Sequence, residues 1–254
     1  MPEPVKIAVA GATGRVGHHV VDVLAERGYG VVPMSRSQGV DVITGSGLAA
    51  ALEGVGLIID AATGPSAEQD PATEFFTTAV RNLHEAGQQA GAEQLIVMSI
   101  IGTDRTAGGY GLAQQAHEQA ALDGPIPARI LRAAQFHEFV SQLTDWGTQG
   151  DVAYVPRMRT QLVAARKVAE TLADMVAQPG LGHDRYLEVA GPRVEYLPEM
   201  ATLLTERRGH PAKVEAVRND ADPDADLYES GGLLPGPGAV LGGPTFAEWL
   251  DATA

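Results

Sequence analysis

The chain has 254 residues, no cysteine and a formal net charge of -14 at pH 7. The absence of cysteine excludes disulfides, thiolate catalysis and cysteine-ligated metals, and the acidic charge opposes binding to nucleic acid. The seven histidines show no spacing typical of metal ligands, so we expect no metal site. Because neither a secretory signal nor an apolar run of transmembrane length is present, we expect a cytoplasmic protein without a membrane partner.

The first predicted element is an apolar strand that ends at Gly11, and a predicted helix over 16–24 follows it at once. The turn between them reads G-A-T-G-R-V-G, with glycines three residues apart. Glycine permits a sharp turn, a close approach to phosphate and close packing of a helix on a strand. The free amides of the helix's first turn face an anion, so we expect a dinucleotide pyrophosphate there, an incidental strand-to-helix turn being the alternative. The residues assigned to this cofactor turn are Gly11, Ala12, Thr13, Gly14, Arg15, Val16 and Gly17.

A second short strand over 31–34 ends at Ser35 and Arg36. In a dinucleotide fold, a carboxylate at this place binds the ribose 2′-hydroxyl, whereas an arginine pairs with a 2′-phosphate. This chain has Arg36, with Arg15 in the neighbouring turn, and no carboxylate. We therefore predict NADP(H) as the preferred cofactor, with NAD(H) possible. A solvated surface arginine is the alternative reading of Arg36.

Further apolar runs at 40–44, 57–60, 94–98 and 128–132 read as strands, and helices are predicted over 48–52, 72–90 and 112–122. Continuous apolar strands separated by helices indicate a parallel sheet that is covered on both faces. The predicted fold class is therefore α/β, a Rossmann-type doubly wound parallel sheet. The small residues that suit a backbone beside the adenine and ribose are Ala61, Ala62 and Thr63.

The strand over 94–98 ends at Ser99, and Tyr110 opens the next helix. Ligands in open α/β sheets bind outside the carboxyl ends of strands, so Ser99 stands where chemistry takes place. This serine and tyrosine resemble those of the short-chain reductases, in which a lysine four residues after the tyrosine lowers the pKa of the phenol. Here Gln114 stands at that position, and an uncharged amide cannot lower a phenol pKa electrostatically. Packing at the start of the helix is the alternative role for Tyr110.

The spacing G-x-x-G-x-x-G resembles that of the atypical short-chain dehydrogenases/reductases. The phrases L-R-A-A-Q-F-H-E-F, L-I-V-M-S-I-I-G-T-D-R and E-V-A-G-P-R resemble actinobacterial NmrA-like reductases, and the resemblance covers nearly the whole chain. It implies that the residues after the 128–132 strand lie beside the nicotinamide, which assigns Ala133, Gln135 and Phe136 as cofactor or substrate neighbours. Arg166 and Lys167 stand where relatives usually carry paired aspartates, so the resemblance is weaker in that loop.

Beyond residue 150 we expect a small C-terminal substrate lobe, with strands near 152 and over 186–190 and helices over 163–177, 197–207 and 245–252. Two segments, 219–226 and 231–244, have the composition of linkers. We predict that the second is an ordered loop that closes over the active site. We treat 1–254 as one NAD(P)-binding domain, with a nucleotide-binding core over about 1–150 and the lobe assembled mainly from 151–254.

The resemblance and the site residues imply an NAD(P)H-dependent oxidoreductase that reduces a quinone or an aromatic polyketide. Hydride transfer to a quinone needs little acid catalysis, so hydrogen bonds from Ser99, Tyr110, Gln114 and Gln135 suffice. Two alternatives stay open. One is a non-catalytic, redox-sensing regulator of the NmrA-like kind, and the other is an isomerase, dehydratase or oxygenase helper that retains the nucleotide.

The expected partner is a small planar aromatic substrate, and the sequence carries no signal for an oligomeric state. Flat apolar walls for such a substrate, with core packing as the alternative reading, are offered by Phe136, Phe139, Trp146 and Tyr154.

Overall fold

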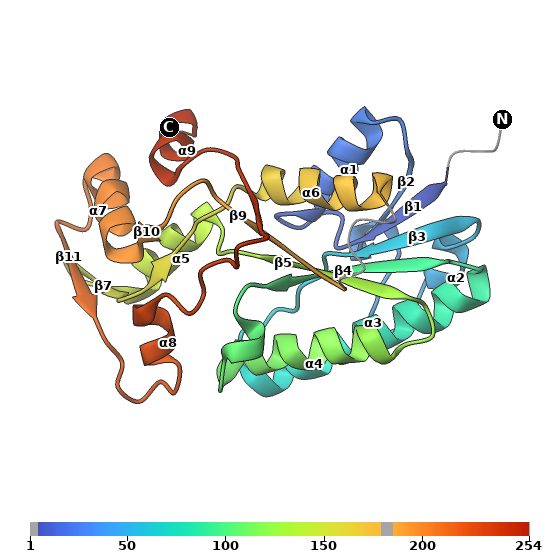
Figure 1. Cartoon of the computed structure of the whole chain (residues 1–254), viewed down its shortest axis with the longest axis horizontal. Helices are drawn as coiled ribbons and strands as arrows, with labels where there is room; N and C mark the ends of the chain where they lie inside the picture. The colour runs from blue at the N-terminus through green and yellow to red at the C-terminus, as the bar shows by residue number, and fades with distance from the viewer. Residues whose placement is uncertain (1–4, 179–184, 254) are drawn as a thin grey trace.

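A seven-stranded sheet forms the centre of the molecule in a computed structural model that describes residues 5–178 and 185–253 (Figure 1). Every pairing in this sheet is parallel, and the strand order is β12-β9-β5-β4-β3-β1-β2. The strands are β1 (Lys6–Ala10), β2 (Gly30–Met34), β3 (Val55–Asp60), β4 (Gln94–Ile100), β5 (Ala128–Ala133), β9 (Tyr186–Ala190) and β12 (Val240–Leu241). The predicted α/β class with a parallel sheet is thereby confirmed.

Helices cover both faces of the sheet (Figure 1). α1 (Gly17–Glu26) and α6 (Ala165–Ala177) lie on one face, and α3 (Gln69–Ala90) and α4 (Gly109–Asp123) lie on the other, with the short α2 (Leu48–Ala51) beside α3. Side chains alternate between the faces along each strand. In β1, Ile7 and Val9 pack toward α1 and α6, whereas Ala8 and Ala10 join the core on the α3 side. Both faces of the sheet are therefore buried, as its continuous apolar strands predict.

The strand order reverses direction at β1. The chain moves from β1 to β2 on one side and then returns to place β3 on the other side of β1. In an open parallel sheet such a reversal leaves a crevice at the carboxyl ends of the two flanking strands, and ligands bind there. The turn that begins at Gly11 lies at this point, so the topology places the predicted cofactor turn at the expected binding crevice.

The apolar run at 40–44 does not form the strand that its composition predicts. The Asp41 side chain accepts a hydrogen bond from the amide of Ile43 at 2.8 Å, and the Asp41 carbonyl accepts one from the amide of Gly45 at 2.9 Å. Asn82 of α3 donates to the carbonyls of Val42 and Ile43 at 2.8 and 2.9 Å. The polar backbone groups are therefore satisfied in a turn, and the sheet ends at β2.

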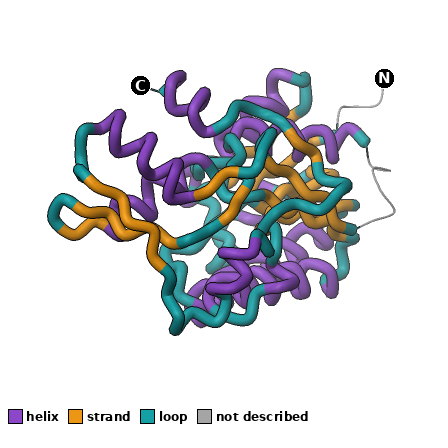
Figure 2. The backbone as a smooth tube through the Cα atoms, turned by 60° about the vertical axis from the view of Figure 1, so that its left-hand side comes forward, coloured by secondary structure: helices purple, strands orange, loops and turns teal. Residues whose placement is uncertain are grey.

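The remaining elements form what we call the C-terminal lobe (Figures 1 and 2). It packs around a separate apolar cluster that includes Val140, Val155, Leu197 and Phe246. Its elements are α5 (His137–Gly147), β6 (Thr148–Gln149), β7 (Val152–Pro156), β8 (Arg159–Thr160), β10 (Glu195–Tyr196), α7 (Leu197–Arg208), β11 (Lys213–Val217), α8 (Ala225–Ser230) and α9 (Phe246–Ala252).

Residues after 150 contribute to the central sheet as well as to the lobe, because β9, β12 and α6 all belong to the sheet layers. Hydrogen bonds hold the segment 231–244 to β9: the amide of Gly236 donates to Glu188 at 2.6 Å, and the amide of Gly242 donates to the Ala190 carbonyl at 3.1 Å. Its closure over the active site stays a prediction. None of the helices in the described ranges is long and apolar enough to cross a membrane.

A buried histidine anchors α9 to the rest of the lobe. The Nε2–H of His137 donates to the Pro244 carbonyl at 3.1 Å, and its ring lies 5.3 Å from that of Trp249. Thr245 and Glu248 form a capping box at the start of α9. Burial lowers the pKa of His137 to about 4, against an ordinary value of 6.5, and the bond to Pro244 opposes this shift only in part.

We expect His137 to make the free energy of unfolding depend on pH. Between pH 6.5 and about 4 the unfolded chain binds a proton at this residue and the folded chain does not. The contribution to stability is therefore complete above pH 6.5 and is lost as the pH falls toward 4, by about 3 kcal/mol. Because His137→Gln keeps an amide donor and removes the titration, urea unfolding at several pH values is expected to show a flatter pH profile for this variant. Parallel profiles would contradict the assignment.

Candidate functional site

The turn after β1 leaves no room for side chains at two of its glycines. Gly11 has a φ of +75°, and a Cβ there would lie 2.6 Å from the carbonyl oxygen of Ala61. A Cβ on Gly17 would overlap the carbonyl oxygen of Gly11. The amide of Gly14 donates to that same oxygen at 2.8 Å, which closes the turn. Helix α1 can therefore pack directly on the end of β1, and the turn residues Thr13, Gly14 and Arg15 stay exposed at the crevice.

The ends of β2 and β3 flank this turn. The amide of Ala12 donates to the Met34 carbonyl at 3.1 Å, and the amide of Ala61 donates to the Ala10 carbonyl at 3.1 Å. The buried Val16 precedes α1. Three predicted nucleotide segments, 11–17, 35–36 and 61–63, thus start from neighbouring strand ends.

Arg36 follows β2 in an exposed turn of 3-10 helix (Arg36–Gln38). Ser35 precedes it, and its hydroxyl donates to Gln38 Oε1 at 2.9 Å. Arg36 takes part in none of the ion pairs found within residues 5–178 and 185–253. Its guanidinium is therefore free for an anion at the end of β2.

A buried acid joins the loop after β3 to helix α4. Asp60 Oδ1 accepts from the amide of Ala62 at 3.0 Å, and Asp60 Oδ2 accepts from the Nε2–H of His117 at 3.2 Å. Both side chains are almost fully buried, and the His117 ring stacks on Phe76 at 4.6 Å. Sequence reasoning did not single out this pair, although a carboxylate at the end of an apolar strand was a visible signal. The pair holds the 61–63 loop against the helix that carries Tyr110 and Gln114.

Ser99 and Gln114 are buried polar residues, and each has one side-chain oxygen without a partner. Ser99 is the second-last residue of β4, and Gln114 lies one turn after Tyr110 in α4; they are 3% and 4% exposed. Within the described part of the chain, neither Ser99 Oγ nor Gln114 Oε1 has a hydrogen-bond partner. Buried polar atoms are almost always paired, so two such orphans at the carboxyl end of one strand and on the adjacent helix indicate a ligand with hydroxyl groups. This fits the ribose of a dinucleotide.

Tyr110 is half-buried and packs edge-on against Phe76, with ring centroids 5.8 Å apart. Burial raises the pKa of the Tyr110 phenol, and a hydrogen bond with the Gln114 side chain opposes this rise only in part. Gln114 carries no charge that would lower the pKa further. At neutral pH the phenol therefore stays protonated and is available as a hydrogen-bond donor.

The residues after β5 lie beside the glycine turn. Ala133 is buried, and its carbonyl accepts from the amide of Ile101 at 2.9 Å. The Gln135 side chain accepts from the Thr160 hydroxyl at 2.5 Å. The guanidinium of Arg15 lies 6.0 Å from the centroid of the Phe136 ring, which is cation–π distance. Arg15 therefore lies beside Phe136.

The other aromatic candidates lie in the C-terminal lobe. Phe139 packs against the core of the lobe, whereas Trp146 is 66% exposed and does not belong to it. Tyr154 lies in β7, and its backbone leaves no space for a Cβ at Gly147.

A carboxylate from the lobe holds the loop that leads to Tyr110. Asp224, 3% exposed, accepts from the amides of Ala107 and Gly108 at 2.7 and 3.2 Å. Next to this contact, Pro223 fills the space that a side chain on Gly108 would need. Sequence reasoning missed Asp224 because it lies in the acidic segment 219–226, whose composition suggested a linker. Through this contact the C-terminal lobe fixes the position of the loop that leads into α4.

Replacing Asp224 with asparagine exchanges one acceptor for a donor that faces a donating amide. We expect hydrogen exchange at the amides of Ala107 and Gly108 to become roughly 10- to 100-fold faster, because a charge-assisted hydrogen bond that protects them is lost. Asp226→Asn is the matched control, because Asp226 is exposed and pairs with Arg218 at 2.8 Å. Equal exchange in the two variants would show that Asp224 does not hold the loop.

Comparison with known proteins agrees with this geometry. The model of the NAD dependent epimerase/dehydratase family matches residues 7–192. Among curated proteins, none matches the chain. An NADPH-dependent quinone oxidoreductase from Escherichia coli, solved with NADPH, is similar in structure with a TM-score of 0.69 at 20% identity, covering 97% of this chain and 99% of that chain.

Two further structures are similar to the chain. For a dTDP-4-dehydrorhamnose reductase from Bacillus anthracis in complex with NADP, the TM-score is 0.71 at 15% identity, with 98% of each chain covered. For a nucleoside-diphosphate-sugar epimerase from Staphylococcus aureus, the TM-score is 0.72 at 15% identity, and the match covers 97% of this chain and 99% of that chain. At these identities the likeness shows the Rossmann-type fold alone, and the family model matches most of the chain. The chain therefore belongs to the NAD dependent epimerase/dehydratase family.

Proposed function

We propose that the protein is an NADP(H)-dependent oxidoreductase that transfers hydride to a quinone or a similar electron-poor planar aromatic compound. The observation that carries the proposal is the state of Tyr110. Its phenol is partly buried, its pKa is raised, and the residue one turn further along α4 is the uncharged Gln114. The site therefore offers hydrogen-bond donors and lacks an activated base at this position.

This arrangement favours quinone reduction over the sugar chemistry that other members of the fold perform. Oxidation of a sugar hydroxyl requires a base that takes the hydroxyl proton, and a phenol with a raised pKa is a poor one. A quinone needs no base: it accepts hydride at the site and a proton from solvent to give the hydroquinone. The intermediate anion is delocalised, so donors such as Tyr110 and Ser99 are sufficient to stabilise it.

The residues around the crevice fit a dinucleotide. The glycine turn would hold the pyrophosphate at the amino terminus of α1, and the 61–63 loop would lie along the adenosine. Ser99 Oγ and Gln114 Oε1 would bond the nicotinamide ribose, and Phe136 with Ala133 would border the nicotinamide. Gln135 would bond the substrate. When bound, NADPH supplies the hydride. The likeness to proteins solved with NADPH, NADP and NAD supports a nicotinamide dinucleotide.

The first test is NADPH oxidation, followed by absorbance, with a panel of naphthoquinones and anthraquinones. We expect turnover that Phe136→Ala and Gln135→Ala abolish, because both residues border the reacting rings. Gln114→Ala is expected to lower the turnover rate roughly threefold to tenfold, because it removes one hydrogen bond. Gln119→Ala, which removes an exposed glutamine from the same helix, serves as the control.

Tight nucleotide binding without turnover on any acceptor would overturn the reductase and favour the redox-sensing regulator or the helper enzyme. Stoichiometric consumption of NADPH separates the reductase from a helper that retains the nucleotide unchanged.

The cofactor preference is tested at Arg36. An arginine that pairs with the 2′-phosphate contributes to NADPH binding and not to NADH binding. We expect Arg36→Ala to weaken NADPH binding roughly 10- to 100-fold and to leave NADH binding unchanged. Calorimetric titration measures both, with Arg81→Ala, an exposed arginine of α3, as the control. An equal loss for both nucleotides would contradict the role.

A further inference from the structure

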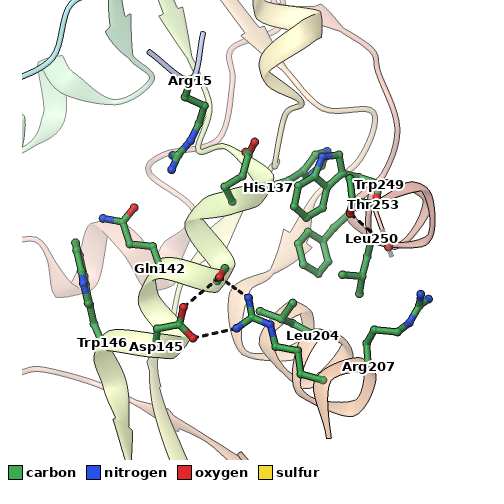
Figure 3. Close-up of a pocket in the computed structure, with 14 residues that line it drawn as sticks. Arg15, His137, Gln142, Asp145, Trp146, Leu204, Arg207, Trp249, Leu250 and Thr253 are labelled. Carbon is green, nitrogen blue, oxygen red and sulfur yellow. Dashed lines mark hydrogen bonds and ion pairs between the residues drawn. The ribbon is translucent and has the colours of Figure 1, made fainter. Parts of the chain in front are cut away.

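A cavity of about 660 Å³ lies where α5, α7 and α9 of the C-terminal lobe meet Arg15 of the glycine turn (Figure 3). Sites for small organic ligands have volumes of roughly 300–1,000 Å³, so one such ligand fits. Neither Ser99, Tyr110 nor Gln114 lines this cavity. The cavity is therefore separate from the residues to which we assign hydride transfer.

Part of the cavity wall is aromatic and aliphatic, and polar side chains line the rest. Trp249 and Leu250 of α9 lie on one side, with Leu204 of α7 below them (Figure 3), and the ring of Phe246 lies 5.8 Å from that of Trp249. At the other end, Trp146 of α5 exposes 66% of its surface. Flat apolar walls of this kind favour a ligand with fused planar rings.

Most of the charged groups in the cavity are already paired. Arg208 donates to Asp145 and Ser141 at 2.9 and 2.6 Å, and Arg207 pairs with Asp251. These contacts leave little unpaired charge on the α7 side of the cavity. The contacts of Arg208 join α7 to α5, and dashed lines in Figure 3 mark the interaction at Asp145.

Arg15 and Glu138 are the two charged residues of the cavity that pair with no other. Within the described ranges neither takes part in an ion pair, and Glu138 Oε2 is buried without a hydrogen-bond partner. Ligand hydroxyl groups suit both residues, since an O–H donates to a carboxylate and a hydroxyl oxygen accepts from a guanidinium. A charged ligand group of either sign would satisfy only one of them.

The cavity adjoins the residues that we place beside the nicotinamide. Arg15 lies over Phe136 at cation–π distance, and His137, the next residue, lines the cavity. We infer that the cavity receives the far rings of the substrate, which is a hydroxylated polycyclic aromatic compound. This inference rests on the proposed reductase function, and it specifies the substrate class.

The two tryptophans of the chain both line the cavity, so fluorescence reports binding directly. In the Trp146→Phe variant, Trp249 is the single tryptophan left. We would titrate this variant, without nucleotide, with quinizarin, a dihydroxylated anthraquinone, and with anthraquinone itself. Saturable quenching by quinizarin is expected, with weaker binding of anthraquinone.

Adding Glu138→Gln to this variant is expected to weaken quinizarin binding roughly tenfold and to leave anthraquinone binding unchanged. Glu206→Gln, an exposed residue of α7 outside the cavity, is the matched control. Absence of saturable quenching, or an equal effect of Glu138→Gln on both compounds, would overturn the inference.

Because binding is measured without NADPH, the two proposals fail separately. Quenching without NADPH oxidation would overturn the reductase and leave the cavity as a binding site for hydroxylated aromatics. Quinone turnover without quenching would support the reductase and overturn the role of the cavity.

Discussion

The close approach of helix α1 to the end of strand β1 is the constraint on which the site depends. The carbonyl oxygen of Gly11 accepts from the amide of Gly14 and lies so near Gly17 that no Cβ fits between them. On the other side, Gly11 itself touches the backbone of Ala61 after β3. Three backbone segments therefore meet without side chains between them. This contact brings the first amides of α1 to the crevice where the strand order reverses.

Two buried carboxylates then hold the rest of the site around that turn. Asp60 connects the loop after β3 to α4 through His117, and Asp224 connects the lobe to the loop before α4. The carboxylates of Asp60 and Asp224 are both almost fully buried, so the loss of a hydrogen-bond partner is costly for either one. Helix α4 is thus held at its start by Asp224 and at its middle by Asp60. Tyr110 and Gln114 lie between the two points.

Local patterns in the sequence predicted most of the sheet and its helices, because an apolar strand or an amphipathic helix is visible within one segment. They failed at 40–44, where an Asp41 turn and Asn82, some 40 residues further along the chain, compete with strand pairing. Most of the segment 219–226 connects β11 to α8, as its composition predicts, but the contact of Asp224 was missed, since the amides from which it accepts lie more than 100 residues earlier. Distant partners of this kind leave no local signal.

In the candidate site, too, local features were predicted and distant contacts were not. Ser99 and Gln114 were predicted from their place after a strand and on the next helix, and the structure finds both buried with free polar atoms. Their roles stay predictions until ligands are tested. The contact between Arg15 and Phe136, and the cavity beside it, could not be predicted, because both depend on how the lobe packs on the glycine turn.

The late position of strand β12 in the chain has a consequence for folding during synthesis. Its two residues pair with β9 and complete the edge of the sheet, yet they follow every other strand in the described part of the chain. During translation, Val189 and Ala190 at the end of β9 therefore lack these partners until residue 241 has left the ribosome. Open edges of this kind invite pairing with other chains. The sheet therefore reaches its final form only after synthesis of the glycine-rich segment that carries β12.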